Sequence, residues 1–460
     1  MRRKRSADKA TRGGVTDRLR TQDSELRTQN FPFQHAAAYC ILHIPMHRVL
    51  LLLPTTTYRT KAFIEAASNL GVELAAASEL PSTMEPLNPG GLLTLDFLRP
   101  ELAAERAAAF AARYPVDVVI PVDEDTAVAA AWIGEALNIP HNPPSAAYTA
   151  KNKLLMRRAL MKAGLPVPRF HSFPVGADPL EHADRVGYPC VVKPAFLSTS
   201  RGVMRADNDL ELVAACDRLE KILVQKDVAR RGGVAATEVL LEQFLPGFEI
   251  AIEGLLTDGR LKVLAIFDKP DQLDGPFFEE TIYVTPSRLT KETQDAVALA
   301  TEAAARAMGL VRGPIHAELR INDSGPWVIE VAARSIGGQC SRTLRFGREL
   351  ASLEELIIRH ALQEDVTSVE REELAAAVMM IPIPRAGVLK EITGIEEARR
   401  LPGIEDVIIT AHLTQRIAPP PEGASYLGFI FSRTTTASEA ESAVREAHRR
   451  LKFTIEDSRQ

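Results

Sequence analysis

The sequence predicts a protein of mixed α/β and α+β class, and three patterns along its 460 residues carry that prediction. Strand and helix patterns alternate over residues 47–147, as in a parallel sheet covered by helices. A hairpin with charged residues on one face follows at 315–334. The last hundred residues combine four strand patterns with two helices, which predicts a separate small α+β unit.

Composition excludes several classes of protein. Hydrophobic residues make up 46% of the chain and charged residues 25%, which is typical of a globular protein with room for three units. The net charge of −5 gives no general attraction to nucleic acid, and no apolar stretch reaches the length of about 18 residues that a membrane helix needs. The cysteines lack metal-ligand spacing and suit reduced thiols; they are Cys40, Cys190, Cys216 and Cys340. We therefore expect a cytoplasmic protein that binds neither nucleic acid nor membrane.

Residues 1–46 differ from the rest of the chain. They are polar, basic and aperiodic, and they lack the apolar core of a signal peptide. Their acidic residues argue against a mitochondrial presequence. The first strand pattern begins at His47, directly after Met46. We expect residues 1–46 to be a disordered arm, or a mis-annotated extension upstream of a start codon at Met46.

The alternating region predicts three strands and three helices. The strands are expected at 49–54, 72–78 and 117–123, and the helices at 62–71, 101–115 and 124–138. A dinucleotide site would need a glycine-rich turn after the first strand, and Pro54-Thr-Thr-Thr-Tyr-Arg59 stands there instead. This unit is therefore interpreted as a scaffold. Residues 55–59 and 123–125 are candidates for substrate contacts from its strand ends, although helix capping explains their Thr and Asp residues equally well.

The middle of the chain contains the parts of a nucleotide site. A short strand at 187–194 carries Lys193 near its end, and a loop of hydroxyls and one glycine follows at 198–203. Such a loop offers N–H and hydroxyl groups to phosphate oxygens, while the lysine supplies a point charge. About forty residues on, residues 239–249 place two acidic groups around an apolar pair, which suits the apolar slot of a base and the hydroxyls of a sugar.

The hairpin brings two glutamates together. If its turn centres on Ser324, the numbers of two facing residues sum to 648. Glu318 then stands opposite Glu330, with Cβ atoms about 5 Å apart. Opposed carboxylates repel, and a hard cation such as Mg²⁺ makes such a pair favourable. The alternative is an exposed hairpin whose glutamates pair with Arg320 or Arg334. The expected apolar face consists of Ile315, Ala317, Leu319, Ile321, Trp327, Ile329, Val331 and Ala333.

Six ordered motifs together resemble the ATP-grasp superfamily of carboxylate–amine ligases, and most closely its L-amino acid ligase branch. They are NKLLMR at 152–157, VVKP at 191–194, STSRG at 198–202, LLEQFLPGFE at 240–249, HAELR at 316–320 and EVAAR at 330–334. The resemblance covers roughly residues 47–460. It implies a pre-ATP-grasp domain at 47–147, an ATP-grasp domain at 148–363 with a mobile lid at about 169–241, and a C-terminal α+β cap domain at 374–460.

The resemblance also implies a role for each motif. The residues placed around ATP are Lys153, Lys193, Ser198, Ser200 and Gly202 at the phosphates, Glu242, Phe244 and Leu245 at adenine, and Glu249 at the ribose. Glu318 and Glu330 would bind Mg²⁺, with Mn²⁺ as a second candidate ion. Arg334 would stabilise the charge that develops on an acyl phosphate. Lys269 and Glu280 are candidate substrate contacts, although surface ion pairing explains them as well.

Two departures from the family pattern leave alternatives open. Ala332 stands where many ATP-grasp enzymes carry a metal-binding Asn, and Asn152 stands where the first lysine is usually preceded by Asp. Loss of the metal-binding Asn raises the alternative of an inactive ATP-binding subunit. A biotin-carboxylase-like enzyme is a second alternative, although the segment 335–340 after Arg334 lacks the acid that serves as its base. We interpret His316 and Cys340 as packing or supporting groups.

The activity implied by the resemblance is ATP-dependent formation of an amide or peptide bond through an acyl phosphate, with release of ADP and phosphate. The expected partners are a small-molecule carboxylate and an amine, amino acids among them. The symmetry statistics of oligomers favour a homodimer.

Overall fold

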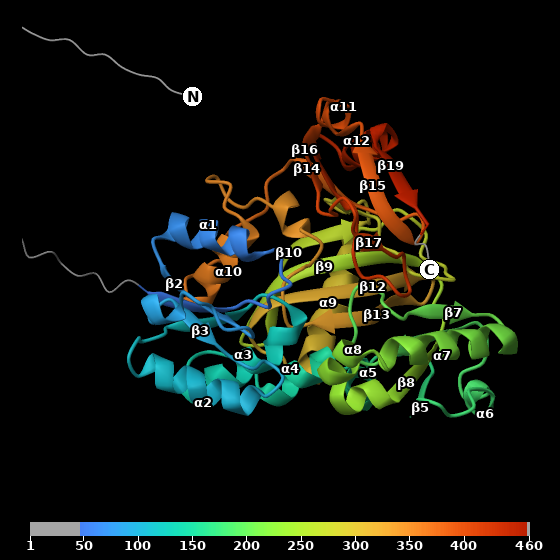
Figure 1. The fold of residues 1–460 in the computed structure, drawn as a ribbon, viewed down its shortest axis with the longest axis horizontal. Helices are drawn as coiled ribbons and strands as arrows, with labels where there is room; N and C mark the ends of the chain where they lie inside the picture. The colour runs from blue at the N-terminus through green and yellow to red at the C-terminus, as the bar shows by residue number, and fades with distance from the viewer. Residues whose placement is uncertain (1–46, 458–460) are drawn as a thin grey trace, which may run out of the picture. The chain divides into compact units, whose positions relative to one another are not determined.

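The structure is a computed structural model, and it describes residues 47–457. The segment 1–46, expected to be disordered or mis-annotated, lies outside the described residues. Figure 1 shows a mixed α/β chain in which the N-terminal sheet is followed by a lid sheet and a long antiparallel sheet. Within the described range, no helix is both long and apolar enough to cross a membrane.

The N-terminal sheet is parallel, with strand order β3-β2-β1-β4. Its strands are β1 (Arg48–Leu52), β2 (Glu73–Ser78), β3 (Leu92–Thr94) and β4 (Val118–Pro121). Alternate residues of β1 enter two cores: Leu50 and Leu52 pack with α2 (Pro100–Ala111) and α3 (Glu124–Leu137), whereas Val49 and Leu51 pack with α1 (Thr60–Leu70). Burial on both faces explains the unbroken apolar run at the start of the fold. The short strand β3 was not predicted.

The lid sheet is antiparallel, with strand order β5-β8-β6-β7. Its strands are β5 (Phe170–Pro174), β6 (Cys190–Pro194), β7 (Met204–Ala206) and β8 (Glu238–Gln243). The side chain of Asn208 accepts the amide of Glu211 and thereby caps α7 (Asp209–Leu223), which packs on β6 and β7. The short helices of this region are α6 (Leu180–Ala183) and α8 (Lys226–Gly232). Two helices precede the lid, α4 (Pro144–Lys151) and α5 (Lys153–Lys162).

The central sheet has eight strands in the order β13-β12-β9-β10-β11-β14-β18-β16 (Figure 1). Its first five are β9 (Phe248–Thr257), β10 (Arg260–Asp268), β11 (Ile282–Thr285), β12 (Gly313–Asn322) and β13 (Gly325–Ala332). The last three are β14 (Ala375–Ile381), β16 (Ile404–Ile409) and β18 (Gly428–Thr434). Helix α9 (Lys291–Met308) packs on β10 and β13, and α10 (Leu353–Ala361) packs on α1.

The C-terminal residues contain the predicted α+β elements, and three of their strands extend the central sheet. Strand β14 pairs antiparallel with β11 over four residue pairs, so the C-terminal strands continue the central sheet. Local patterning predicted the strands but not this non-local pairing. A second, three-stranded sheet has the order β17-β15-β19, and α12 (Ala437–Arg450) packs on β14 and β18. The remaining elements are β15 (Gly387–Thr393), α11 (Ile395–Arg399), β17 (Arg416–Ile417) and β19 (Lys452–Glu456).

Candidate active site

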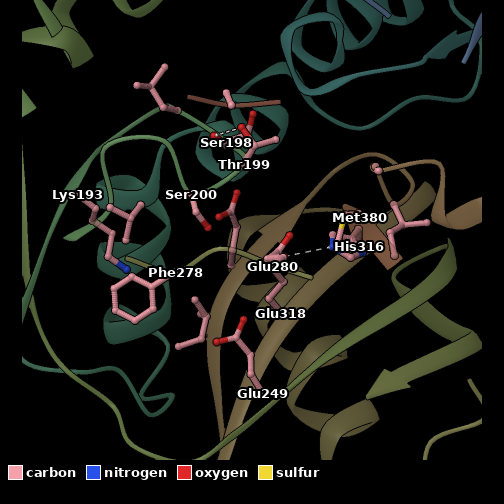
Figure 2. A pocket seen from close by; sticks show the side chains of 18 of the residues that line it. Lys193, Ser198, Thr199, Ser200, Glu249, Phe278, Glu280, His316, Glu318 and Met380 are labelled. Atoms are coloured by element: carbon pink, nitrogen blue, oxygen red, sulfur yellow. Dashed lines mark hydrogen bonds and ion pairs between the residues drawn. The ribbon is translucent and has the colours of Figure 1, made fainter. Parts of the chain in front are cut away.

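A cavity of about 410 Å³ is lined by residues of the lid sheet, the central sheet and the C-terminal strands. In Figure 2 Lys193 lies at one end of the view and Met380 at the other, with the carboxylates of Glu280 and Glu318 between them. Most of the site residues predicted from the sequence line this cavity. They are Lys153, Lys193, Ser198, Ser200, Glu242, Phe244, Leu245, Glu249, Glu318, Glu330 and Arg334.

The predicted hairpin register is confirmed at its functional positions. Glu318 pairs with Glu330 across β12 and β13. Beyond this pair a β-bulge shifts the register, so that Leu319 pairs with Val328. The predicted apolar face was therefore wrong in β13: Val328 packs in the core, whereas Ile329 lines the cavity. Trp327, also assigned to that face, lies outside this core and its indole N–H donates to Asn322.

The opposed glutamates each face a lysine. The Glu330 carboxylate lies 2.9 Å from Lys153 Nζ, which also donates to the carbonyl of Leu197 at 2.8 Å. The Glu318 carboxylate lies 3.3 Å from Lys269 Nζ and 3.6 Å from His316 Nε2. The alternative pairing with Arg320 or Arg334 is wrong, because those arginines bind Glu249 and Glu124 instead.

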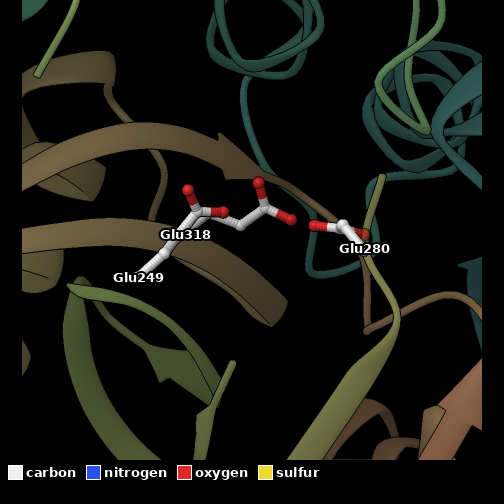
Figure 3. Close-up of side chains that lie close together, drawn as sticks. All are labelled: Glu249, Glu280 and Glu318. Carbon is white, nitrogen blue, oxygen red and sulfur yellow. The ribbon is translucent and has the colours of Figure 1, made fainter. Parts of the chain in front are cut away.

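Lys269 lies among three carboxylates, those of Glu249, Glu280 and Glu318. Figure 3 shows these three side chains converging, and one oxygen from each lies within 4.8 Å of the other two. Lys269 is only 3% exposed, so the expected surface ion pair is a buried network. Burial alone would lower the pKa of Lys269, but the three carboxylates raise it well above its usual value. Burial and the neighbouring Glu318 raise the pKa of Glu280 to about 7.

The Glu242 carboxylate has a different environment from the one predicted. Both of its oxygens are bound, one by Arg157 Nε at 2.7 Å and the other by Lys193 Nζ and Arg157 Nη2. Burial would raise the pKa of Glu242, but Arg157 and Lys193 lower it to about 2. The predicted adenine contact of Glu242 therefore cannot come from a free carboxylate. Its side chain instead positions Lys193, whose own pKa is lowered by burial.

Apolar side chains, among them Phe244 and Leu245, follow the end of β8 just after Glu242. The Phe244 ring is covered by the guanidinium of Arg205 at 4.3 Å and that of Arg320 at 5.1 Å. Phe278 lies 6.4 Å from Phe244, ring centre to ring centre. The amide N–H of Leu245 has no hydrogen-bond partner among the described residues.

Sequence reasoning missed Phe278 and Ile329 as cavity residues. The signal for Phe278 was a pair of adjacent phenylalanines in a loop rich in Gly and Pro, and for Ile329 there was none.

Glu249 is held by two cations. Its carboxylate lies 2.9 Å from Lys269 Nζ and 2.9 Å from Arg320 Nε. Arg320 also donates to the carbonyl of Leu245 at 2.7 Å. Glu249 therefore lies between the apolar region around Phe244 and Lys269, which also binds Glu280 and Glu318.

The predicted phosphate loop has unusual backbone angles. Thr199 and Ser200 have φ of +57° and +54°, and Gly202 has φ of +75°. The positive φ of Gly202 favours glycine, and a Cβ at this position would lie 2.9 Å from the end of the Leu219 side chain. Ser198 and Ser200 line the cavity, but the Gly202 amide does not face it and donates to the carbonyl of Pro421 at 3.0 Å. This contact joins the lid to the C-terminal part.

Arg334 is anchored from the N-terminal scaffold. Its Nε lies 2.9 Å from the carboxylate of Glu124, at the first turn of α3. Burial would lower the pKa of Arg334, but Glu124 and Glu330 raise it. Of the candidates at 123–125, Glu124 therefore reaches the site indirectly, whereas Asp125 pairs with Lys151 and Arg231.

The other scaffold candidates, residues 55–59, divide into two groups. Arg59 is buried and binds Glu354 and Ser335, which is a structural role. Thr56 and Tyr58 line the cavity, and the Tyr58 hydroxyl accepts the amide of Gly338.

His316 lies between the carboxylates of Glu253 and Glu318. Burial alone would lower the pKa of His316, but these two carboxylates raise it. The neighbouring Cys340 also lines the cavity, and burial raises the pKa of its thiol. Both residues therefore border the site, and the Cys340 thiol is not activated.

Comparison with known proteins agrees with this geometry. Residues 186–343 match the ATP-grasp domain, and residues 379–456 match the L-amino acid ligase C-terminal domain 2. The crystal structure of an L-amino acid ligase from Bacillus licheniformis is similar with a TM-score of 0.75 and 28% identity, over 89% of this chain and 99% of that one. An alanine–anticapsin ligase of Bacillus subtilis is 30% identical over 222 residues, 45% of this chain and 46% of that protein.

The extent of these likenesses differs. A second curated relative is 28% identical, and the match spans 64% of its length. The chain therefore spans less than two thirds of the length of each of these two curated relatives. A biotin carboxylase domain of Hydrogenobacter thermophilus is 18% identical with a TM-score of 0.60, over 89% of this chain and 90% of that one, which is a likeness of fold alone.

Proposed function

The chain is built from an ATP-grasp domain and an L-amino acid ligase C-terminal domain, and from this premise we propose that it is an ATP-dependent carboxylate–amine ligase. One observation carries the proposal. A single cavity gathers Lys153, Lys193, Glu318, Glu330 and Arg334, and the C-terminal strands close the same cavity. A protein that only bound nucleotide would not need a half-buried arginine and two opposed glutamates in the same cavity.

The nucleotide would lie between the lid and the central sheet. Lys153 and Lys193 supply positive charge for phosphate oxygens, and Ser198 and Ser200 line the same cavity with their hydroxyl groups available as donors. The free amide N–H of Leu245 can donate to the edge of a base. An apolar slot for that base is offered by Phe244, Phe278 and Ile329. Glu249 would accept hydrogen bonds from ribose hydroxyls while its cations keep it ionised.

The chemistry of the donors at the hairpin fits Mg²⁺, with Mn²⁺ as a second candidate. Glu318 and Glu330 present carboxylate oxygens on facing strands, and hard divalent cations prefer such ligands. Mg²⁺ bound there would neutralise charge on the transferring phosphoryl group. Ala332 can supply no ligand oxygen from its side chain, so these glutamates are the hairpin's own candidate ligands.

The proposed reaction has two steps. A carboxylate oxygen of the acid attacks the γ-phosphorus of ATP, the bond to the bridging oxygen breaks, and ADP leaves. The nitrogen of the amine then attacks the acyl carbon, phosphate leaves, and the nitrogen loses a proton. Arg334 holds the negative charge that develops in both steps, since Glu124 fixes its guanidinium in place. Glu280 is the candidate acceptor for the amine proton, because its pKa of about 7 suits proton transfer at neutral pH.

The two alternatives make different demands on the site. The segment after Arg334 lines the cavity with Ile336, Gly337, Gly338 and Cys340, none of which is an acid able to serve bicarbonate as a base. An inactive ATP-binding subunit would retain nucleotide binding without product formation. We therefore favour amide formation, and the following experiment distinguishes it from bicarbonate phosphorylation and from ATP binding without turnover.

The experiment measures phosphate release from ATP and Mg²⁺ with amino acids offered singly and in pairs, followed by mass spectrometry. We expect a product with the mass of two acids less water. Arg334→Ala should lower kcat by about 10²–10³-fold, and Arg449→Ala, at an exposed ion pair on α12, should leave it unchanged. Phosphate release that depends on bicarbonate and biotin, or ATP binding without turnover on any acid and amine, would overturn the proposal.

A further inference from the structure

We propose that Glu441 of α12 is a positioning residue for the ligase reaction, because it anchors both ends of the loop that carries Lys269 and Glu280. This loop, residues 269–281, joins β10 to β11 and is irregular along its length. Lys269 is its first residue, and Glu280 is its last but one. The inference rests on the proposed function, in which Glu280 accepts the amine proton, and it adds to that reaction a residue that does not line the cavity.

One branch of contacts runs from Glu441 to the residue before Lys269. The Glu441 Oε2 atom lies 2.8 Å from Arg288 Nη1, and Arg288 Nε lies 2.8 Å from the carboxylate of Asp268. Asp268 is only 1% exposed, and its carboxylate also accepts the amide N–H of Arg288 at 3.0 Å and the hydroxyl of Ser287 at 2.6 Å. These contacts fix Asp268, and with it the backbone from which Lys269 extends.

The other branch runs from Glu441 to the residue after Glu280. The Glu441 Oε1 atom lies 2.9 Å from Nη2 and 3.0 Å from Nε of Arg445, one turn further along α12. Arg445 Nη2 lies 2.6 Å from one carboxylate oxygen of Asp271, and the hydroxyl of Thr281 donates to the other. Thr281 follows Glu280 directly, so this branch fixes the backbone at the far end of the loop.

The two branches meet at a single carboxylate, and each of its oxygens binds one arginine. A carboxylate accepts from two cations at once, whereas an amide has one carbonyl oxygen and would turn its NH₂ group towards the second arginine. Glu441→Gln should therefore detach one branch without changing the size of the side chain. Arg288 and Arg445 each keep an aspartate partner in this variant, so neither cation is left unpaired.

Anchoring of the loop ends matters because the middle of the loop is attached to the lid. The amide N–H of Arg205, in β7, donates to the carbonyl of Pro276 at 2.9 Å. The Arg205 guanidinium also donates to the carbonyl of Asp274 at 2.8 Å. Movement of the lid would therefore pull on the middle of the loop, and the branches from Glu441 would hold its two ends in place during that movement.

Steady-state kinetics of Glu441→Gln test the inference. The probe is the pair of L-amino acids that gives most phosphate release with ATP and Mg²⁺. We expect kcat to fall about tenfold or more, because a small displacement of a proton acceptor strongly slows its reaction. KM for ATP should change by less than about twofold, since Glu441 lies outside the cavity that would hold the nucleotide.

Glu446→Gln is the matched control. Glu446 lies on the same helix, and its carboxylate also binds two arginines, Arg449 and Arg450. Neither arginine has a contact with the loop at 269–281 among the ion pairs and hydrogen bonds of the described residues. We therefore expect Glu446→Gln to keep the kcat of the unmodified protein.

A double variant separates positioning from a general loss of stability. If Glu441 acts through Glu280, Glu441→Gln should change the residual kcat of Glu280→Gln by less than about twofold, because the group that it positions is already absent. A substitution that merely weakened the fold would lower kcat by the same factor with and without Glu280.

The outcomes distinguish this inference from the proposed function. An unchanged kcat in Glu441→Gln, an equal loss in Glu446→Gln, or the same loss in the Glu280→Gln background would each overturn the positioning role and leave the ligase function standing. Absence of turnover by the unmodified protein on every pair of acid and amine would overturn the ligase function, and the positioning role with it.

Discussion

At the scale of single residues, the buried carboxylate of Glu242 does more than its sequence context indicates. It binds Arg157 and Lys193, and Arg157 also donates to the carbonyls of Val328 and Ile329 in the β12–β13 hairpin. The lid strand, helix α5 and the hairpin are therefore joined through two side chains. The partner of Glu242 could not be predicted, because it lies 85 residues away and charge patterns do not reveal long-range pairs.

Replacing Glu242 with Gln should destabilise the protein by about 3–5 kcal/mol, because it leaves two buried cations without their anion. Urea unfolding monitored by fluorescence would measure the change. Asp295→Asn removes the carboxylate of an exposed pair with Lys291 in α9 and should cost less than about 1 kcal/mol. Equal effects of the two substitutions would contradict the assigned role.

Glu280 gives the expected pH dependence. Its pKa is raised to about 7, so the carboxylate that accepts a proton forms only as the pH rises through that value. At saturating substrates the rate of amide formation should therefore rise with pH below about 7 and level off above it. Glu280→Gln should remove this dependence along with most of the activity. If the rate of the Glu280→Gln variant still rises over the same pH range, the titrating group would be His316, whose pKa is also raised.

The hairpin shows how far the sequence can predict the site. The turn residues and the alternation of charge fixed the pairing of Glu318 with Glu330 correctly. The bulge was not predictable, since Trp327, Val328 and Ile329 form a continuous apolar run in which either register buries hydrophobic side chains. Ile329 reached the cavity for this reason, and no signal in the residue itself marks it.

At the scale of elements, the lid is attached on two sides. Arg218 of α7 binds Glu422, and the nearby Gly202 amide donates to Pro421. Arg231 of α8 binds Asp125, at the first turn of α3, with a distance of 2.6 Å. Under the proposed function, opening of the lid to admit or release nucleotide would break these contacts. Sequence patterns predicted the lid strands, but its partners lie 106 and 204 residues away from these arginines, beyond any local signal.

Arg218→Ala should loosen the lid and raise KM for ATP by no more than about 5-fold, because the ion pair is half exposed. Steady-state kinetics would measure the change, and Glu422→Ala should produce the same shift. The double variant should add nothing further. Additive effects would show that the two residues act independently.

At the scale of the whole molecule, the central sheet joins parts that sequence patterns separate. The prediction of a mixed α/β fold with a parallel N-terminal sheet was correct, because each element carries its own periodicity. The pairing of β11 with β14 was missed because about ninety residues lie between these strands. Met380 and Phe429 enter the cavity through this pairing, so the C-terminal strands contribute directly to the site.

A core substitution in the C-terminal part should therefore weaken the sheet beyond it. Val444→Ala in α12 removes the two methyl groups of a fully buried side chain, and we expect faster amide hydrogen exchange in β11 and β14 together. Mass spectrometry of peptic fragments would report both strands. Loss of protection confined to β14, β18 and β16 would show that the C-terminal part opens on its own.

The arrangement around Lys269 also has an evolutionary consequence. Its ammonium group is the counter-ion that three acids share, at positions 249, 280 and 318. Loss of the lysine alone would leave those acids facing one another, and loss of one acid would shift the charge balance of the other two. Across descendants of this sequence, the four positions should covary, with single replacements rare at position 269 and compensated elsewhere in the set.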